Sequence, residues 1–286
     1  MKKYFSLIKF SHTIFALPFA MVGFFLGWKQ NELTNSPNTF FVKWVAVIAC
    51  MVFARSAAMA FNRYLDRHFD AKNNRTASRE IPSGKIKASH ALLFTVLSAV
   101  LFILSTLLLN RLCFFLSFVA LFVILFYSYT KRFTALCHLV LGVGLSLAPI
   151  GAYLAVTGVF DWVPVLFSLT VLFWVSGFDI IYALQDEEFD RSVSLHSIPV
   201  AIGKKNALLL SVLLHLICAA ALISAGLMAG FGSWFWIGAF GFCTMLVYQH
   251  SLVKPNDLSK VNVAFMTANG IASVVLSLFV IADIYL

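Results

Sequence analysis

The stretches NRYLDRHFD at 62–70 and DIIYALQDEEFD at 179–190 decide the fold of this chain, because each lies at the end of a long apolar run. Their polar residues form two ladders, Asn62, Asp66 and Asp70 in the first and Asp179, Asp186 and Asp190 in the second. Steps of four residues, such as the one from Asp66 to Asp70, place side chains on one face of a helix. Oxygen ligands grouped in this way suit Mg²⁺, which takes one or two carboxylates together with waters and phosphate oxygens. We therefore expect helices that end at a magnesium-bound diphosphate, at the edge of a membrane.

The composition of the chain is that of an integral membrane protein. Of 286 residues, 61% are hydrophobic and only 12% are charged, whereas an ordinary soluble domain has about 25% charged residues. Because about 20 apolar residues cross the hydrocarbon core, the apolar runs predict an all-α, polytopic membrane protein with about nine transmembrane helices in a bundle. The predicted spans lie at about 12–28, 40–61, 89–109, 112–130, 135–156, 162–182, 206–229, 233–253 and 262–285.

The lysines and arginines are distributed unevenly between the two predicted sides of the membrane. All 21 fall at the N-terminus or in the loops on the ladder side, except Lys29, Lys43, Arg55 and Arg111. Since positive loops tend to stay inside, we expect a multi-pass protein of the bacterial inner membrane with its N-terminus and both ladders in the cytoplasm. The net charge of +9 then reflects topology and anion binding. Nucleic-acid binding is not expected, because the basic residues lie in short loops beside the membrane.

The two ladders are spaced as a coarse internal repeat. Asp186 follows Asp66 by 120 residues, and four predicted helices separate equivalent points. The two units then have the same orientation in the membrane, so both ladders meet on one side of the bundle. We therefore interpret residues 1–286 as a single membrane domain of two parallel helical repeats, at about 1–132 and 133–286.

Two charged residues lie within predicted spans. Asp179 precedes Asp186 by seven residues, and an ionised group at the bilayer centre costs about 2.5 to 3.5 kcal/mol or more unless it lines a polar cavity. Arg55 likewise precedes Asn62 by seven residues, two helical turns deeper on the same face. A cation and an acid buried on the ladder-bearing helices predict a hydrated, functional cavity between them.

The motifs resemble those of the UbiA superfamily of intramembrane prenyltransferases. The resemblance rests on NRYLDRHFDAKNNRTASREIPSG at 62–84, YSYTKRFT at 127–134 and DIIYALQDEEFDRSVSLHSIPVAIG at 179–203, and it covers essentially the whole chain. It implies a helical bundle around a central cavity that the motif loops cap on the cytoplasmic side. It also implies that two Mg²⁺ ions hold a polyprenyl diphosphate there, and that the prenyl group passes to an aromatic ring.

The resemblance assigns roles to individual residues. Arg55 matches an arginine that the hydroxybenzoate branch places near the aromatic substrate. The chemistry of the reaction, rather than the resemblance, makes Asp179 a candidate for orienting the phenol or accepting the ring proton, while a role in supporting Asp186 is equally open. Two positions depart from the family pattern: Arg63 stands where many members have Asp, and Ser194 where Gly is frequent, but neither removes a metal ligand. The predicted metal ligands are Asn62, Asp66, Asp70, Asp186 and Asp190, the predicted catalytic residues are Asp179, Asp66 and Asp186, and the predicted substrate-binding residues are Asn62, Arg55, Arg75, Arg79, Tyr127, Tyr129, Lys131 and Tyr182.

The expected activity is a Mg-dependent aromatic polyprenyl transfer. Its substrates would be a polyprenyl diphosphate and a small aromatic acid, with 4-hydroxybenzoate in ubiquinone-type synthesis as the first choice. The opening FSHTIFALPFA at 10–20 also resembles a branch that acts on a naphthoate-type acceptor in menaquinone synthesis by the futalosine route. A secondary transporter is the non-enzyme alternative, because intramembrane acids also mark ion pathways. The lipid bilayer is an expected partner, and no obligate protein partner is expected.

Overall fold

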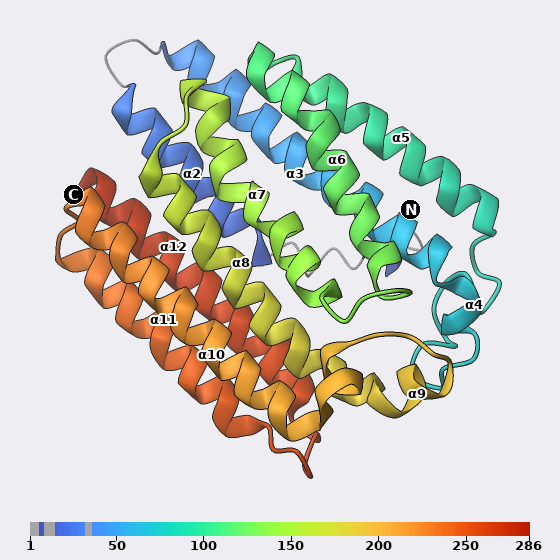
Figure 1. The fold of residues 1–286 in the computed structure, drawn as a ribbon. Helices are drawn as coiled ribbons and strands as arrows, with labels where there is room; N and C mark the ends of the chain where they lie inside the picture. The colour runs from blue at the N-terminus through green and yellow to red at the C-terminus, as the bar shows by residue number, and fades with distance from the viewer. Residues whose placement is uncertain (1–5, 9–14, 32–35) are drawn as a thin grey trace.

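The computed structural model describes residues 6–8, 15–31 and 36–286, and within them it is a bundle of long helices without a named strand (Figure 1). The prediction of an all-α fold is therefore confirmed. The long helices are α2 (Leu17–Gln30), α3 (Pro37–Leu65), α5 (Ala88–Thr106), α6 (Arg111–Thr130), α7 (Cys137–Thr157), α8 (Trp162–Ala183), α10 (Ile198–Ala229), α11 (Ser233–Leu252) and α12 (Asn269–Tyr285), the last preceded by a π-helical turn at Val263–Ala268.

Seven of the described helices are long and apolar enough to cross a membrane, namely α3, α5, α6, α7, α8 with its continuation, α10, and α12 with the π-helical turn. Helices α2 and α11 lie in the bundle but are not among these seven. The count of nine spans therefore stays a prediction, as does the division into two repeats. The N-terminal residues 1–5 and the first part of the segment FSHTIFALPFA, residues 10–14, lie outside the described residues.

Helix α8 lies at the centre of the bundle, between α7 and α10 (Figure 1). Its buried aromatic side chains form the middle of the largest hydrophobic cluster, where the rings of Trp174 and Phe178 meet edge to face with centroids 5.1 Å apart. Phe19 from α2 and Phe242 from α11 pack against Trp174. Such aromatic pairs stabilise a fold beyond the area that they bury. The helix that carries Asp179, the first residue of the second ladder, is thus packed against α2 and α11 through its aromatic side chains.

Helices α7 and α8 approach each other closely at Gly142. A Cβ atom at this position would lie 2.5 Å from the carbonyl oxygen of Leu172 and would also meet the Ser176 hydroxyl. Glycine allows two backbones to approach in this way, as small residues commonly do between membrane helices.

We expect Gly142→Ala to destabilise the protein, because the added methyl meets backbone atoms that cannot move independently of α8. Overpacking of this kind costs about 1 to 3 kcal/mol, which thermal unfolding in detergent would detect. Gly144→Ala is the matched control on the same helix, since its nearest neighbour would be a side-chain carbon of Ile124 at 3.6 Å. Equal unfolding temperatures for the two variants would contradict the proposed contact.

Neither ladder lies on one uninterrupted helix, so this detail of the prediction is wrong. Helix α3 ends at Leu65, Asp66 caps it, and a separate short helix α4 (Arg67–Asp70) follows. The second ladder passes through a 3₁₀ turn (Leu184–Asp186) into α9 (Glu187–Ser192). Backbone bonds from Asp66 N to Asn62 O and from Asp70 N to Asp66 O, at 2.9 and 2.8 Å, nevertheless keep the first ladder compact. In Figure 1, α4 and α9 lie together at one end of the bundle.

Candidate active site

The carboxylates of the first ladder both contact arginines. Asp66 Oδ1 accepts a hydrogen bond from Arg132 Nη2 at 2.9 Å, and its Oδ2 accepts one from Asn62 Nδ2 at 3.0 Å. Asp70 Oδ1 accepts from Arg79 Nη1 at 2.6 Å. The second oxygen of Asp70, Oδ2, is buried and has no hydrogen-bond partner. One buried carboxylate oxygen is thus left without a donor at the last residue of the first ladder.

The second ladder is bound by the loop that follows the first. Arg75 Nε donates to Asp186 Oδ1 at 2.9 Å, its Nη2 pairs with Oδ2, and its Nη1 donates to the Tyr182 hydroxyl at 2.9 Å. Asn73 Nδ2 also donates to Asp186 Oδ1, at 3.2 Å. These contacts join residues more than 100 positions apart. The two ladders therefore meet at one end of the bundle.

The turn after α6 contacts both ladders through two neighbouring residues. Lys131 Nζ lies 2.7 Å from Asp190 Oδ2, and Arg132 binds Asp66. The carbonyl of Lys131 accepts a hydrogen bond from the backbone N–H of His196 at 2.8 Å, which ties this turn to the loop after α9. Three segments that are distant in sequence thus converge on one cluster of alternating charges.

Burial raises the pKa of the Asp66 carboxyl, and the nearby Arg132 only partly offsets this effect. A further cation close to Asp66 would favour its ionised form. An additional positive charge at this end of the bundle would therefore stabilise the ladder in its charged state.

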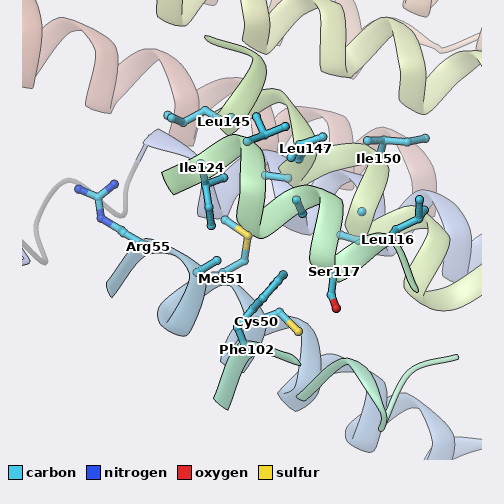
Figure 2. A pocket seen from close by; sticks show the side chains of 18 of the residues that line it. Cys50, Met51, Arg55, Phe102, Leu116, Ser117, Ile124, Leu145, Leu147 and Ile150 are labelled. Carbon is cyan, nitrogen blue, oxygen red and sulfur yellow. The ribbon is translucent and has the colours of Figure 1, made fainter. Parts of the chain in front are cut away.

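An apolar cavity of about 370 Å³ lies between α3, α6 and α7 (Figure 2). Arg55 stands at one end of the labelled side chains, and Leu116 and Ile150 stand toward the other. Among the described residues that line it, Arg55 is the only one with a charged side chain, and Tyr127 lies on the same lining. The cavity can therefore accommodate a long apolar group, and the cation at one end of it is the guanidinium of Arg55.

The other predicted residues occupy different surroundings. Tyr182 contacts Arg75, as described above, and Asp179 pairs with His138 on α7, where Oδ2 and Nδ1 are 2.7 Å apart. Tyr129 is not among the described residues that line the cavity; it is 49% exposed, and the Arg132 guanidinium lies over its ring. A role for Tyr129 in binding substrate stays a prediction.

Sequence reasoning missed three contributors to this region. They are Asn73, Arg132 and His138. Arg132 could have been found, since it directly follows Lys131 in a short loop on the ladder side. Asn73 lies in a polar loop without a distinctive spacing, and His138 lies at the start of an apolar run, so neither had a signal of its own.

The donor set of the ladders fits Mg²⁺ held jointly with a diphosphate. In the described part of the chain, no three His, Cys, Asp or Glu side chains are arranged to hold a metal ion by themselves. The ladder groups are, however, oxygen donors throughout, and Asp70 Oδ2 is buried without a partner. Because Mg²⁺ completes its shell with waters and phosphate oxygens, few protein ligands are needed. The surrounding Arg and Lys side chains suit the diphosphate itself.

The family model described as the UbiA prenyltransferase family matches residues 16–271. The chain belongs to this family. The family predicted from the two ladders is thus confirmed, and the protein is an integral membrane prenyltransferase.

Curated members of the family are similar to this chain over about three quarters of its length. A protein from Aeromonas salmonicida is 34% identical over 216 residues, which cover 75% of this chain and 74% of the relative. One from Nitrosospira multiformis is 32% identical over 226 residues, with coverages of 78% and 77%. Both are named 4-hydroxybenzoate octaprenyltransferase. These names give no specific support to a naphthoate-type acceptor.

Solved structures of the family have the same fold. The apo structure of a UbiA homologue from Aeropyrum pernix has a TM-score of 0.79 at 27% identity and covers 96% of each chain. A UbiA homologue from Archaeoglobus fulgidus, bound to DMAPP and Mg²⁺, has a TM-score of 0.78 at 21% identity and covers 99% of each chain. At the latter identity, the likeness concerns the fold alone.

Proposed function

We propose that this protein transfers a polyprenyl group from polyprenyl diphosphate to 4-hydroxybenzoate in ubiquinone-type quinone synthesis. The observation that carries the proposal is the convergence of both ladders and four cations, Arg75, Arg79, Lys131 and Arg132, at the same end of the bundle. The apolar cavity lined by Arg55 supports it further. The names of the relatives support 4-hydroxybenzoate as the acceptor.

The ladders and their cations would hold the leaving group. Asn62, Asp66, Asp70, Asp186 and Asp190 are the residues that would hold Mg²⁺, which neutralises charge on a departing diphosphate when bound. The allylic C–O bond of the substrate breaks during the transfer, and its electron pair stays with the diphosphate. Fixed donors from Arg75, Arg79 and Lys131 would stabilise the negative charge as it develops, because preorganised groups need not reorient during the reaction.

The other reactants would occupy the deeper part of the site. The apolar cavity would take the polyprenyl tail and exclude water, which would otherwise capture the allylic cation. Arg55 would hold the acceptor carboxylate, since a guanidinium binds a carboxylate through two parallel hydrogen bonds. A ring carbon then forms the new C–C bond and loses its proton, with Asp179 as the candidate to orient the phenol or accept that proton.

The protein would work in the bacterial inner membrane with its ladders on the cytoplasmic side. This proposal rests on the excess of Lys and Arg in the loops at the ladder end of the bundle.

Transfer by the purified protein tests the function. With a polyprenyl diphosphate and Mg²⁺, we expect a prenylated product from 4-hydroxybenzoate together with one diphosphate per product, and we expect both to disappear on addition of EDTA. A dihydroxynaphthoate assayed in parallel is the comparison acceptor. Faster transfer to the naphthoate would contradict the assigned acceptor but keep the reaction class. Absence of diphosphate release with either acid would contradict the proposal and favour the transporter alternative.

A further inference from the structure

A buried histidine contacts the intramembrane aspartate. His138 lies in the first turn of α7 with 3% of its surface exposed, and its Nδ1 is 2.7 Å from Asp179 Oδ2 on α8. The second ring nitrogen, Nε2, lies 3.4 Å from the backbone nitrogen of Ile198, at the start of α10. The carbonyl of His138 accepts from the Ser176 hydroxyl at 3.3 Å. The imidazole is therefore held between three helices.

These neighbours define which ring nitrogen carries the hydrogen. A backbone N–H can only donate, so the contact with Ile198 makes Nε2 of His138 the acceptor. In a neutral imidazole the hydrogen is then on Nδ1, which donates it to Asp179 Oδ2. The Asp179 side chain keeps 23% of its surface exposed, so a bound molecule can contact it in addition to His138. One carboxylate oxygen thus contacts His138, while part of the side chain stays exposed.

We propose that His138 is a positioning residue that orients the Asp179 carboxylate toward the aromatic acceptor. The inference rests on the proposed function, in which Asp179 faces the acceptor ring. A carboxylate on an otherwise apolar helix can rotate about its side-chain bonds, and a donor fixed on a neighbouring helix removes this freedom. Groups that act on a reacting atom gain from such orientation by a third residue. Through Ile198 the same imidazole also connects Asp179 to the segment that follows the second ladder.

Two amide substitutions separate orientation from bulk packing. His138→Asn places an amide nitrogen near the position of Nδ1, whereas His138→Gln places its amide near Nε2 and loses the donor to Asp179. We expect His138→Gln to lower kcat about tenfold, the scale of a lost hydrogen bond to a charged group. KM for the prenyl diphosphate should change by less than about twofold. His138→Asn should recover most of the wild-type kcat.

A double-mutant cycle tests whether His138 acts through Asp179. Asp179→Asn combined with His138→Gln should be no slower than Asp179→Asn alone, because the orienting contact has already lost its function. His250→Gln is the matched control, since His250 pairs with a second buried histidine, His215, at 2.8 Å and contacts no described carboxylate. Thermal unfolding of each variant in detergent reports on folding. If His138→Gln does not fold, the smaller His138→Ala takes its place in the cycle.

The outcomes distinguish this inference from the proposed function. An unchanged kcat in His138→Gln, equal losses in the Asn and Gln variants, or an additive cycle would each overturn the positioning role. A wild-type protein that prenylates neither aromatic acid would overturn the proposed function instead, whatever the His138 variants do.

Discussion

Asp190→Asn and Asp66→Asn should each reduce kcat by about a hundredfold or more, because each removes a carboxylate that is proposed to hold Mg²⁺ at the leaving group. Asparagine keeps the size of the side chain, so the loss reflects charge and coordination rather than packing. The structure gives a reason to test one residue from each ladder. Asp190 faces Lys131 and Asp66 faces Arg132, so that each variant also leaves a cation at the site without its present partner.

Glu188→Gln is the control for these two variants. Glu188 lies in α9 beside Asp190, but its side chain is 91% exposed, so its activity should stay within about twofold of the wild type. Initial rates across a Mg²⁺ titration are the measurement, with thermal unfolding in detergent to confirm that each variant is folded. A ladder variant that keeps more than about half of wild-type activity at limiting Mg²⁺ would not have lost a ligand, and the two-ladder site would be refuted.

Arg55→Met should raise KM for the aromatic acid about a hundredfold and leave KM for the prenyl diphosphate nearly unchanged. Removing one partner of a desolvated charge pair costs about 2 to 5 kcal/mol, and Met suits the apolar surroundings of Arg55. Arg55→Lys keeps the charge but loses the two parallel hydrogen bonds, so its KM should rise about tenfold. The measurement is steady-state kinetics with each substrate varied in turn.

Lys43→Met is the matched control for Arg55→Met, because it also removes a cation from α3. Lys43 lies near the start of α3 and donates to the carbonyl of Val156 at 2.9 Å, at the opposite end from the ladders. It should leave KM for the acid within about twofold of the wild type. A rise in KM of Arg55→Met that is confined to the prenyl diphosphate would contradict the assignment of Arg55 to the acceptor. An equal defect for both substrates would indicate a structural role for Arg55.

The polar residues of the site could be predicted where their signal is local. The four-residue steps of the ladders and the position of Lys131 beside a span are visible in the sequence. The ends of the helices were harder, because Asp66 and Asp186 each lie where a helix changes geometry, and capping depends on neighbours that the sequence does not display. The partner of Asp179 could not be predicted, since His138 reaches it only through the packing of α7 on α8.

The hydrophobic runs of the sequence also predicted local features better than contacts between helices. They identified the long helices and the motif loops, because hydrophobic length is set by the bilayer. They also predicted α2 and α11 as spans, and this stays a prediction, since a helix in a bundle can be covered by other helices instead of lipid. The close approach at Gly142 is likewise a property of two helices together.

The neighbouring residues Lys131 and Arg132 have a consequence for how the two predicted repeats could be separated. Each binds a carboxylate of a different ladder, and the predicted repeat boundary follows directly after Arg132. A chain divided there would leave both cations on the first fragment, while Asp190 would remain on the second. The second fragment alone would carry that acid without its counter-ion. The two halves are therefore not interchangeable modules, because the charge balance of one is completed by the last residues of the other.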